Sequence, residues 1–317
     1  MRIPFPIPAP GSKPFDLAGF GLNSVDLMTV VGEFPASNSK QRLQRFARMP
    51  GGQIATAMAT ASRLGWRTRY IGSFGDDAFG TLSRESLEHE GVDVSAARTV
   101  PGATNQFAVV LVDARTGERT VLWDRHPDLT MRPEDVPSGA VTSGRMLIVD
   151  CHETAAAAQA AKYARVVGVP TIVDVEKVRP GIADLLQHID AIIAAQDFPT
   201  ALTGYDEPGR AIEALGREYG AALVTVTLGE DGSLSWCGGR QIRTAAFKVN
   251  CVDSTGAGDV FRGAFAAACL RDATGELEDA LAYANAAAAL NCRALGARAG
   301  MPRPEEIEQL LNIQPYF

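Results

Sequence analysis

The 317-residue sequence predicts an α/β fold with three layers: a doubly wound, mostly parallel sheet between two layers of helices, and a small β-hairpin lid. Two observations predict it. Short apolar strands alternate with helical segments along most of the chain, and parallel strands that are buried on both faces need helical crossovers. Between about residues 100 and 125 this alternation stops, and two strand-like runs meet at a turn without a helix between them.

The first half of the chain supplies the start of the sheet and the lid. Residues 1–14 contain five prolines, and we expect an extended tail there, followed by one domain over 15–317. The expected elements after the tail are an apolar strand within 15–30 that breaks at glycines, a helix at 52–64, a strand at 67–75, a helix at 77–90, and a hairpin of 106–113 and 119–123 around a turn at 114–118. We expect segments of about 26–50 and 100–128 to form the lid.

The second half returns to strand–helix units. The expected strands are 146–150, 170–175, 191–195 and 222–229, and the expected helices are 154–167, 180–188 and 206–219. A polar hairpin at 233–250 and two alanine-rich helices, 257–270 and 277–294, complete the domain.

Composition excludes several classes of protein. The net charge of −7 argues against a protein that binds nucleic acid through non-specific phosphate contacts, because such binding needs a basic face. No uncharged apolar run approaches the ~20 residues that cross a bilayer, so we expect no membrane partner. The five cysteines form no C-x-x-C pair and the four histidines show no metal spacing, which indicates reduced thiols and a cytoplasmic location.

The strongest chemical signal is the segment 253–259, Asp-Ser-Thr-Gly-Ala-Gly-Asp, directly before a helix. Small residues at a helix start let backbone N–H groups approach an anion, and the helix dipole favours negative charge there. The carboxylate of Asp259 in the first helical turn could then accept a proton from an attacking hydroxyl. The alternative is that Gly256 ends a turn and Asp259 only complements the helix dipole.

Two further sites favour binding of a polar ligand. Gly51 and Gly52 open the first long helix, and Gln53 and Thr56 would project from the start of that helix, although an ordinary helix cap explains them as well. Asn23 and Asp26 follow the first strand, where open α/β sheets bind ligands. Gly19 and Gly21 also suggest a dinucleotide-binding dehydrogenase, but the third glycine of that motif is missing at Ser24.

These sites, in this order, resemble the ribokinase superfamily of PfkB carbohydrate kinases over residues 15 to about 305. The stretch from Asp253 to Phe261 resembles the D-T-x-G-A-G-D-x-F signature of that family, and the segments 51–65 and 72–80 resemble its N-terminal signature. The resemblance implies an ATP-dependent sugar kinase in which Asp259 is the general base and Gly256, Ala257 and Gly258 form the anion hole. It also implies sugar binding by the residues Asn23, Asp26, Gly51, Gly52, Gln53 and Thr56.

The resemblance extends to the nucleotide, the ions and the assembly. It implies that ATP is bound by Thr227, Gly229, Gly232 and Asn285, that Mg²⁺ accompanies ATP, and that Asp253 anchors a K⁺ site. A homodimer through the lid is expected from the family and from the exposed strand edge. Lid residues 102–125 and the segments 173–180 and 194–199 resemble the ketohexokinase-like branch, which favours a ketohexose substrate.

The sequence departs from the family in two places. Many members carry Asn at the position of Thr56, and the N-x-x-E motif is not visible around residues 195–197. Two other functions therefore stay open: a nucleoside kinase of the adenosine type, and a sugar-binding sensor that has lost turnover.

Overall fold

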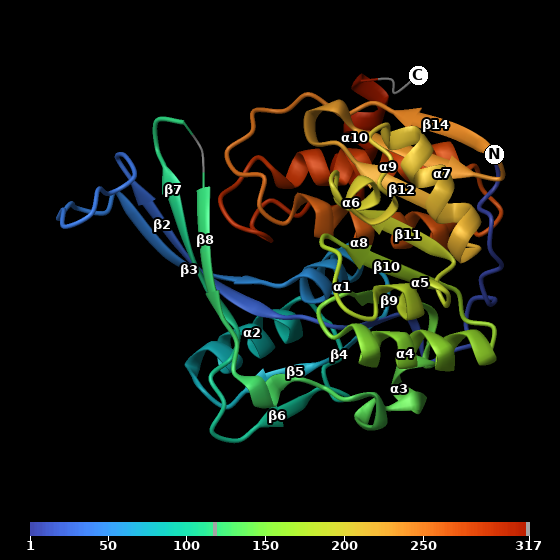
Figure 1. Ribbon diagram of the computed structural model, residues 1–317, viewed down its shortest axis with the longest axis horizontal. Coiled ribbons are helices and arrows are strands. Elements are labelled where there is room, and N and C mark those ends of the chain that lie inside the picture. Colours follow the sequence, from blue (N-terminus) through green and yellow to red (C-terminus); the bar gives the residue numbers. More distant parts are fainter. Residues whose placement is uncertain (117–118, 315–317) are drawn as a thin grey trace.

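The computed structural model, which describes residues 1–116 and 119–314, has the predicted α/β architecture (Figure 1). Its central sheet has eight strands, six of them parallel, and two antiparallel strands continue it at one edge. In spatial order these strands are β14 (Arg240–Thr244), β13 (Ser233–Cys237), β12 (Leu223–Thr227), β11 (Ala191–Ala194), β10 (Thr171–Val175), β9 (Gly144–Asp150), β1 (Phe15–Phe20) and β4 (Thr68–Ile71).

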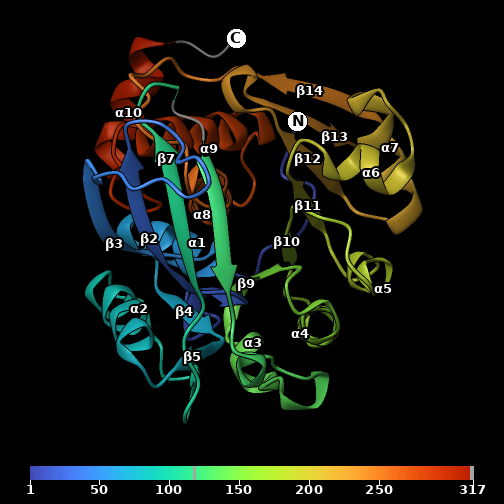
Figure 2. The same ribbon diagram turned by 60° about the vertical axis from the view of Figure 1, so that its left-hand side comes forward.

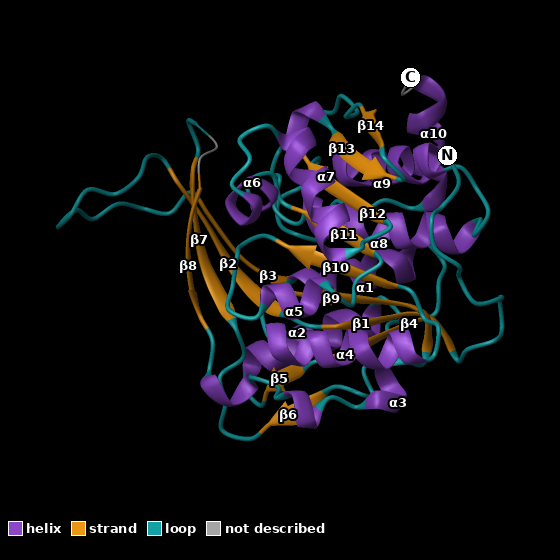
Figure 3. Ribbon diagram, turned by 45° about the vertical axis from the view of Figure 1, so that its right-hand side comes forward, coloured by secondary structure: helices purple, strands orange, loops and turns teal. Residues whose placement is uncertain are grey.

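Helices cover both faces of this sheet (Figure 3) because successive side chains of each strand enter different cores. In β9, Met146 and Ile148 join one core, whereas Leu147 and Val149 join the other. The first core is closed by α1 (Gln53–Arg63), α2 (Ala78–His89), α8 (Ala257–Arg271), α9 (Leu277–Asn291) and α10 (Pro304–Ile313). The second is closed by α3 (Ser138–Val141), α4 (Thr154–Val166), α5 (Ile182–Leu186), α6 (Phe198–Thr203) and α7 (Pro208–Tyr219).

The lid is a separate four-stranded sheet that projects from the body (Figures 1 and 2). Its order is β3 (Arg45–Gly51), β2 (Ser24–Val31), β7 (Phe107–Asp113) and β8 (Arg119–Asp124). The antiparallel β7–β8 pair is the predicted hairpin, and β2 and β3 add the other expected lid segment. The turn predicted at 114–118 lies partly outside the described residues.

Several elements differ from the sequence prediction. The expected strand at 67–75 is two strands, because β5 (Ser73–Gly75) leaves the central sheet and pairs with β6 (Arg98–Val100). Helix α10 was not predicted, although Ile307, Leu310 and Leu311 recur at helical spacing and pack on the first core. Single 3₁₀ turns at Pro127–Leu129, Pro133–Asp135 and Gly229–Asp231 connect larger elements.

Residues 1–14 form no helix, and the segment turns at residues 10–11, but it does not hang free. Ile3 and Phe5 are buried in the first core, and the backbone N–H of Ile3 donates to Gly275 O at 3.1 Å. The buried guanidinium of Arg145 donates to Pro8 O at 2.7 Å. These contacts make the segment part of the body rather than a loose tail.

Among the described residues, no helix combines the length and the apolar character needed to cross a membrane.

Candidate active site

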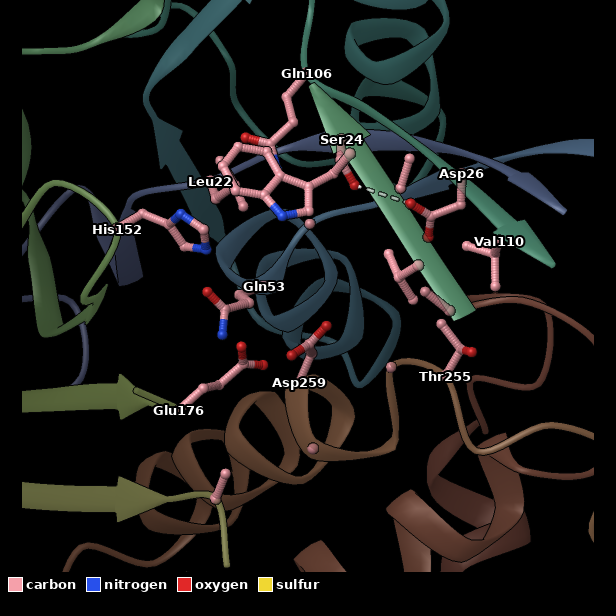
Figure 4. Close-up of a pocket in the computed structure, with 18 of the residues that line it drawn as sticks. Leu22, Ser24, Asp26, Gln53, Gln106, Val110, His152, Glu176, Thr255 and Asp259 are labelled. Carbon is pink, nitrogen blue, oxygen red and sulfur yellow. Dashed lines mark hydrogen bonds between the residues drawn. The ribbon is translucent and has the colours of Figure 1, made fainter. Parts of the chain in front are cut away.

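A cleft of about 560 Å³ lies where the inner face of the lid meets the ends of the strands and the start of α8 (Figure 4). The lid, α1, the loops after β9 and β10, and the turn before α8 all contribute to its walls. The residues that line it are Leu22, Ser24, Asp26, Gly52, Gln53, Gln106, Ala108, Val110, Arg119, Val121, Trp123, His152, Glu176, Lys177, Arg179, Ala195, Thr227, Ser254, Thr255, Gly256, Gly258, Asp259, Arg262 and Ala297.

The turn before α8 is rigidly built. Asp253 accepts hydrogen bonds from the backbone N–H and the hydroxyl of Thr255 at 2.9 and 2.7 Å, and from the N–H of Gly296 at 2.8 Å. Gly256 then adopts a left-handed conformation with φ 75°, and a Cβ atom there would overlap the backbone carbonyl of Ala297. Only glycine fits this position. The N–H of Ala257 donates to Ser254 O at 3.2 Å, and the N–H groups that directly follow it, in the first turn of α8, have no acceptor within the helix.

Asp259 stands in the first turn of α8, on the wall of the same cleft. Burial raises the pKa of its carboxyl to about 7, against the opposing charge of Arg262. The carboxylates of Glu176 and Asp26 act in the same direction as burial, and Arg298 opposes them. A carboxylate with a pKa near neutrality is suited to accept a proton at physiological pH.

Asp26 and Gln53 form a polar patch beside Asp259. Burial raises the pKa of Asp26 to about 6, and the Ser24 hydroxyl donates to its Oδ1 at 3.2 Å. Gln53 begins α1. Its amide nitrogen and amide oxygen are both buried, and neither has a hydrogen-bond partner within residues 1–116 and 119–314. A buried amide without partners is costly unless a ligand supplies them. Figure 4 shows the side chains of Gln53, Glu176 and Asp259 directed toward one space.

Arg298 lies next to this patch and supports it through hydrogen bonds, a role that was not predicted from the sequence. It donates to Gly51 O at 2.6 Å, Thr56 Oγ1 at 3.1 Å and Ser86 Oγ at 3.1 Å. Burial lowers its pKa to about 10, while the charge of Asp26 opposes this shift. Arg298 follows α9 in an irregular segment with no motif, so nothing local in the sequence marks it.

His152, one of the four histidines without metal spacing, lines the cleft. Burial lowers its pKa to about 4, with Arg179 acting in the same direction, so its imidazole is neutral at pH 7. Figure 4 shows it across from Gln53. It follows β9 by two residues, and the only available signal was its position at the end of a parallel strand.

The comparisons with known proteins agree with this geometry. The model of the pfkB family carbohydrate kinases matches residues 16–304. The chain belongs to this family. It is 31% identical to a fructokinase of Klebsiella pneumoniae, over 84% of this chain and 93% of that protein. It is 30% identical to an ATP-dependent ribose-1-phosphate kinase of Halopiger xanaduensis, over 90% of this chain and 95% of that protein.

Solved structures extend the likeness to the fold. The structure of Arabidopsis thaliana ribokinase complexed with ribose and ATP aligns with a TM-score of 0.83 and 26% identity, covering 95% of this chain and 99% of that one. The protein is thus an ATP-dependent carbohydrate kinase with a ribokinase-like fold, which confirms the predicted family and architecture. The narrower resemblance to ketohexokinases stays a prediction.

Three residues expected to bind sugar lie outside the wall of the cleft in this kinase: Asn23, Gly51 and Thr56. The amide of Asn23 donates to Tyr70 Oη at 2.8 Å and to Ser73 O at 2.7 Å, and it accepts from Ser83 Oγ at 3.0 Å. Gly51 and Thr56 instead accept hydrogen bonds from Arg298, and Thr56 is fully buried. These three residues support the site, whereas Asp26, Gly52 and Gln53 reach the cleft.

The residues expected to bind the nucleotide are also divided. Thr227 lines the cleft, at the end of β12, whereas Gly229, Gly232 and Asn285 do not. The side chain of Asn285 donates to Ser233 Oγ at 2.9 Å and so holds the start of β13 against α9. Ala257 is the one residue of the predicted anion hole that is not on the wall, although its backbone joins Gly256 to Gly258.

Proposed function

We propose that this kinase transfers the γ-phosphoryl group of ATP to a hydroxyl of a neutral sugar, with a ketohexose favoured and Asp259 as the general base. One observation carries the proposal: the carboxyl of Asp259, the turn at 256–258 and the unpartnered amide of Gln53 line a single cleft. A base, an anion cradle and a polar recognition group are the parts that phosphoryl transfer to an alcohol requires.

The proposed chemistry is a single in-line displacement. The sugar hydroxyl gives its proton to the carboxylate of Asp259, and the new bond joins the sugar oxygen to the γ-phosphorus. The bond between the γ-phosphorus and the bridging oxygen breaks, and ADP leaves. Amide N–H groups at the start of α8 offset the charge that spreads over the phosphoryl oxygens.

Within this scheme, Asp26 and Gln53 hold the sugar. The carboxylate of Asp26 accepts hydrogen bonds from sugar hydroxyls, and the amide of Gln53 can both donate and accept. Gly52 has φ 90°, and a Cβ there would overlap the backbone of Asn23, so only glycine fits at this point of the cleft wall.

The nucleotide belongs on the other side of the turn at 256–258. Thr227, Lys177 and Arg179 line the cleft, and the Nε of Arg179 is buried without a partner among the described residues. Within residues 1–116 and 119–314, no group of three or more His, Cys, Asp or Glu side chains could hold a metal ion. We therefore infer that Mg²⁺ is held mainly by the ATP phosphates and water, where it neutralises their charge. A K⁺ ion near Asp253 stays a prediction.

The charges of the sugar side favour a neutral substrate over a sugar phosphate. Each guanidinium nitrogen of Arg298 donates to a protein oxygen, Arg262 pairs with Asp174 at 2.7 Å, and Arg125 pairs with Glu153. Arg119 on the lid donates to Ser254 in the turn before α8. The imidazole nearby is neutral at pH 7, and Asp26 adds negative charge. A phosphate on the substrate would meet carboxylates there, and like charges in a partly buried site repel.

A nucleoside is disfavoured for a different reason. Among the residues of the described cleft wall, Trp123 is the only Phe, Tyr or Trp, so no second ring of that kind could sandwich a base. The predicted homodimer through the lid and the cytoplasmic location rest on the family resemblance and on the cysteine pattern respectively, and we retain them as proposals.

A coupled ADP-release assay tests the proposal. Fructose, ribose, ribose 1-phosphate and adenosine are compared at equal concentration, with Asp259→Asn as the control for background ATP hydrolysis. We expect the highest kcat/KM with a neutral sugar and a fall of about 10²–10⁴-fold in Asp259→Asn. Turnover of Asp259→Asn within tenfold of the wild-type rate would reject the assigned base, and preference for ribose 1-phosphate or adenosine would reject the assigned substrate class.

A further inference from the structure

The edge strand of the lid, β8, presents one face to the cleft. Arg119, Val121 and Trp123 alternate along it and line the cleft, as the two-residue period of a strand requires. Val121 and Trp123 are 48% and 61% exposed despite facing the site. The alternation is visible in the sequence, but nothing in the sequence indicates which face of the hairpin lies toward the cleft.

Arg119 joins this strand to the anion-hole turn. Its Nη1 donates to the Oγ of Ser254 at 2.8 Å, across 135 positions of sequence. β8 is one of the two edge strands of the lid, together with β3, and it pairs only with β7. The contact with Ser254 therefore links the lid's outermost described strand to the floor of the cleft.

Ser254 is a fixed partner. It lies between Asp253 and Thr255, whose hydrogen bonds with each other and with Gly296 hold the turn in place. Because the turn is held by its own hydrogen bonds and β8 has a neighbouring strand on one side only, the hydrogen bond to Ser254 fixes the position of β8 relative to Asp259. The same guanidinium is also a positive charge on the wall that Gly256 and Gly258 share.

We propose that Arg119 is a positioning residue that latches the lid: its hydrogen bond to Ser254 holds β8 over the sugar and keeps a cation beside the anion-hole turn during turnover. The inference rests on the proposed function, because it assigns the phosphoryl group to that turn. Lid closure excludes water and completes a site, so loss of the latch weakens sugar binding and slows the transfer together.

The test is a double-variant cycle with Arg119→Gln, Ser254→Ala and the combination. We expect kcat/KM for the sugar to fall at least about tenfold in Arg119→Gln, because both the hydrogen bond and the positive charge are lost. In Ser254→Ala only the acceptor is lost, and we expect a fall of about threefold. The double variant should be no worse than Arg119→Gln by more than about twofold, because both changes break one interaction. Arg119→Lys, which keeps the charge, should fall between wild type and Arg119→Gln.

A matched control separates the latch from general damage to the lid. Arg115 pairs with Glu33 at 3.2 Å and with Asp113 at 3.3 Å and does not line the cleft. Arg115→Gln should keep kcat/KM within about twofold of wild type, and thermal unfolding of Arg119→Gln should match wild type within about 1 °C, since exposed polar contacts add little stability.

Lid closure has a readout that does not depend on turnover. Trp123 lies on the inner face of β8, so its fluorescence reports on the position of the lid. Its contribution is the part of the sugar-induced fluorescence change that is lost in Trp123→Phe. Arg119→Gln should raise the sugar concentration at half-change about tenfold. The latch is rejected if Arg119→Gln leaves both this midpoint and kcat/KM within twofold of wild type, or if the effects of the two single variants multiply. A wild-type protein that produces no sugar-dependent ADP would instead reject the proposed function, whatever the fluorescence shows.

Discussion

The pH dependence of turnover tests the environment of Asp259 most directly. Burial raises the pKa of this carboxyl from 3.8 to about 7, and a general base must be ionised to act. We therefore expect kcat/KM for the sugar to fall about tenfold per pH unit below pH 7 and to reach about 1% of its plateau at pH 5. A carboxyl that kept its ordinary pKa would still be roughly nine-tenths ionised at pH 5.

Glu176→Gln is the perturbation that identifies the group. Because the charge of Glu176 raises the pKa of Asp259, its removal should move the acid limb of the profile to lower pH, by about half a unit to one unit. Glu134→Gln, which removes an exposed carboxylate outside the cleft, should leave the limb in place.

The assay is ADP release from pH 5 to pH 9, with saturating ATP and varied sugar. The terminal phosphate of ATP also titrates near pH 6, but a limb that belongs to ATP would not move in Glu176→Gln. A limb near pH 4, or one near pH 7 that Glu176→Gln leaves unchanged, would refute the reasoning.

Three further predictions concern single residues. Asp259→Asn should raise the unfolding temperature relative to wild type, by a margin that grows from pH 4 to about pH 7 and then levels, because a raised pKa makes the ionised carboxyl costly only in the folded state; calorimetry at several pH values measures it. Gly256→Ala should lower kcat at least about tenfold, because its φ of 75° and a neighbouring backbone carbonyl oppose a side chain, whereas Gly220→Ala, with φ 70° and open space, should leave steady-state kcat within twofold. Gln53→Ala should raise KM for the sugar about tenfold without lowering the unfolding temperature. Asn23→Ala loses three internal hydrogen bonds and should lower the unfolding temperature by about 5 °C, so equal effects of the two variants on unfolding would contradict this contrast.

The parts of the site that lie close together in sequence could be predicted. Residues 253–259 combine a turn, a glycine with positive φ and a helix start, and each of these has a local signature. The alternation of strands and helices likewise predicted the sheet, because burial on both faces leaves an apolar pattern in each strand. The hairpin at 107–124 could be predicted for the opposite reason, because no helical segment separates its two strands in the sequence.

The rest depends on which side chains meet across the fold. Asn23 and Gln53 are both amides beside glycine-rich segments, yet Asn23 is satisfied by Tyr70, Ser73 and Ser83, whereas Gln53 has no partner among the residues that the structure describes. No local pattern distinguishes them. Arg298 was missed because its three acceptors come from the end of β3, from α1 and from α2, which are remote from it in sequence.

One buried cation behind the cleft affects both the sugar side and the base, because the charge of Arg298 acts on Asp26 and on Asp259 alike. A change at Asp26 made to accept a different substrate would therefore also retune the acid–base step. Redesign of specificity should instead begin at Val121 and Trp123 on the inward side of β8, whose apolar side chains can be exchanged without altering the electrostatic balance that the chemistry depends on.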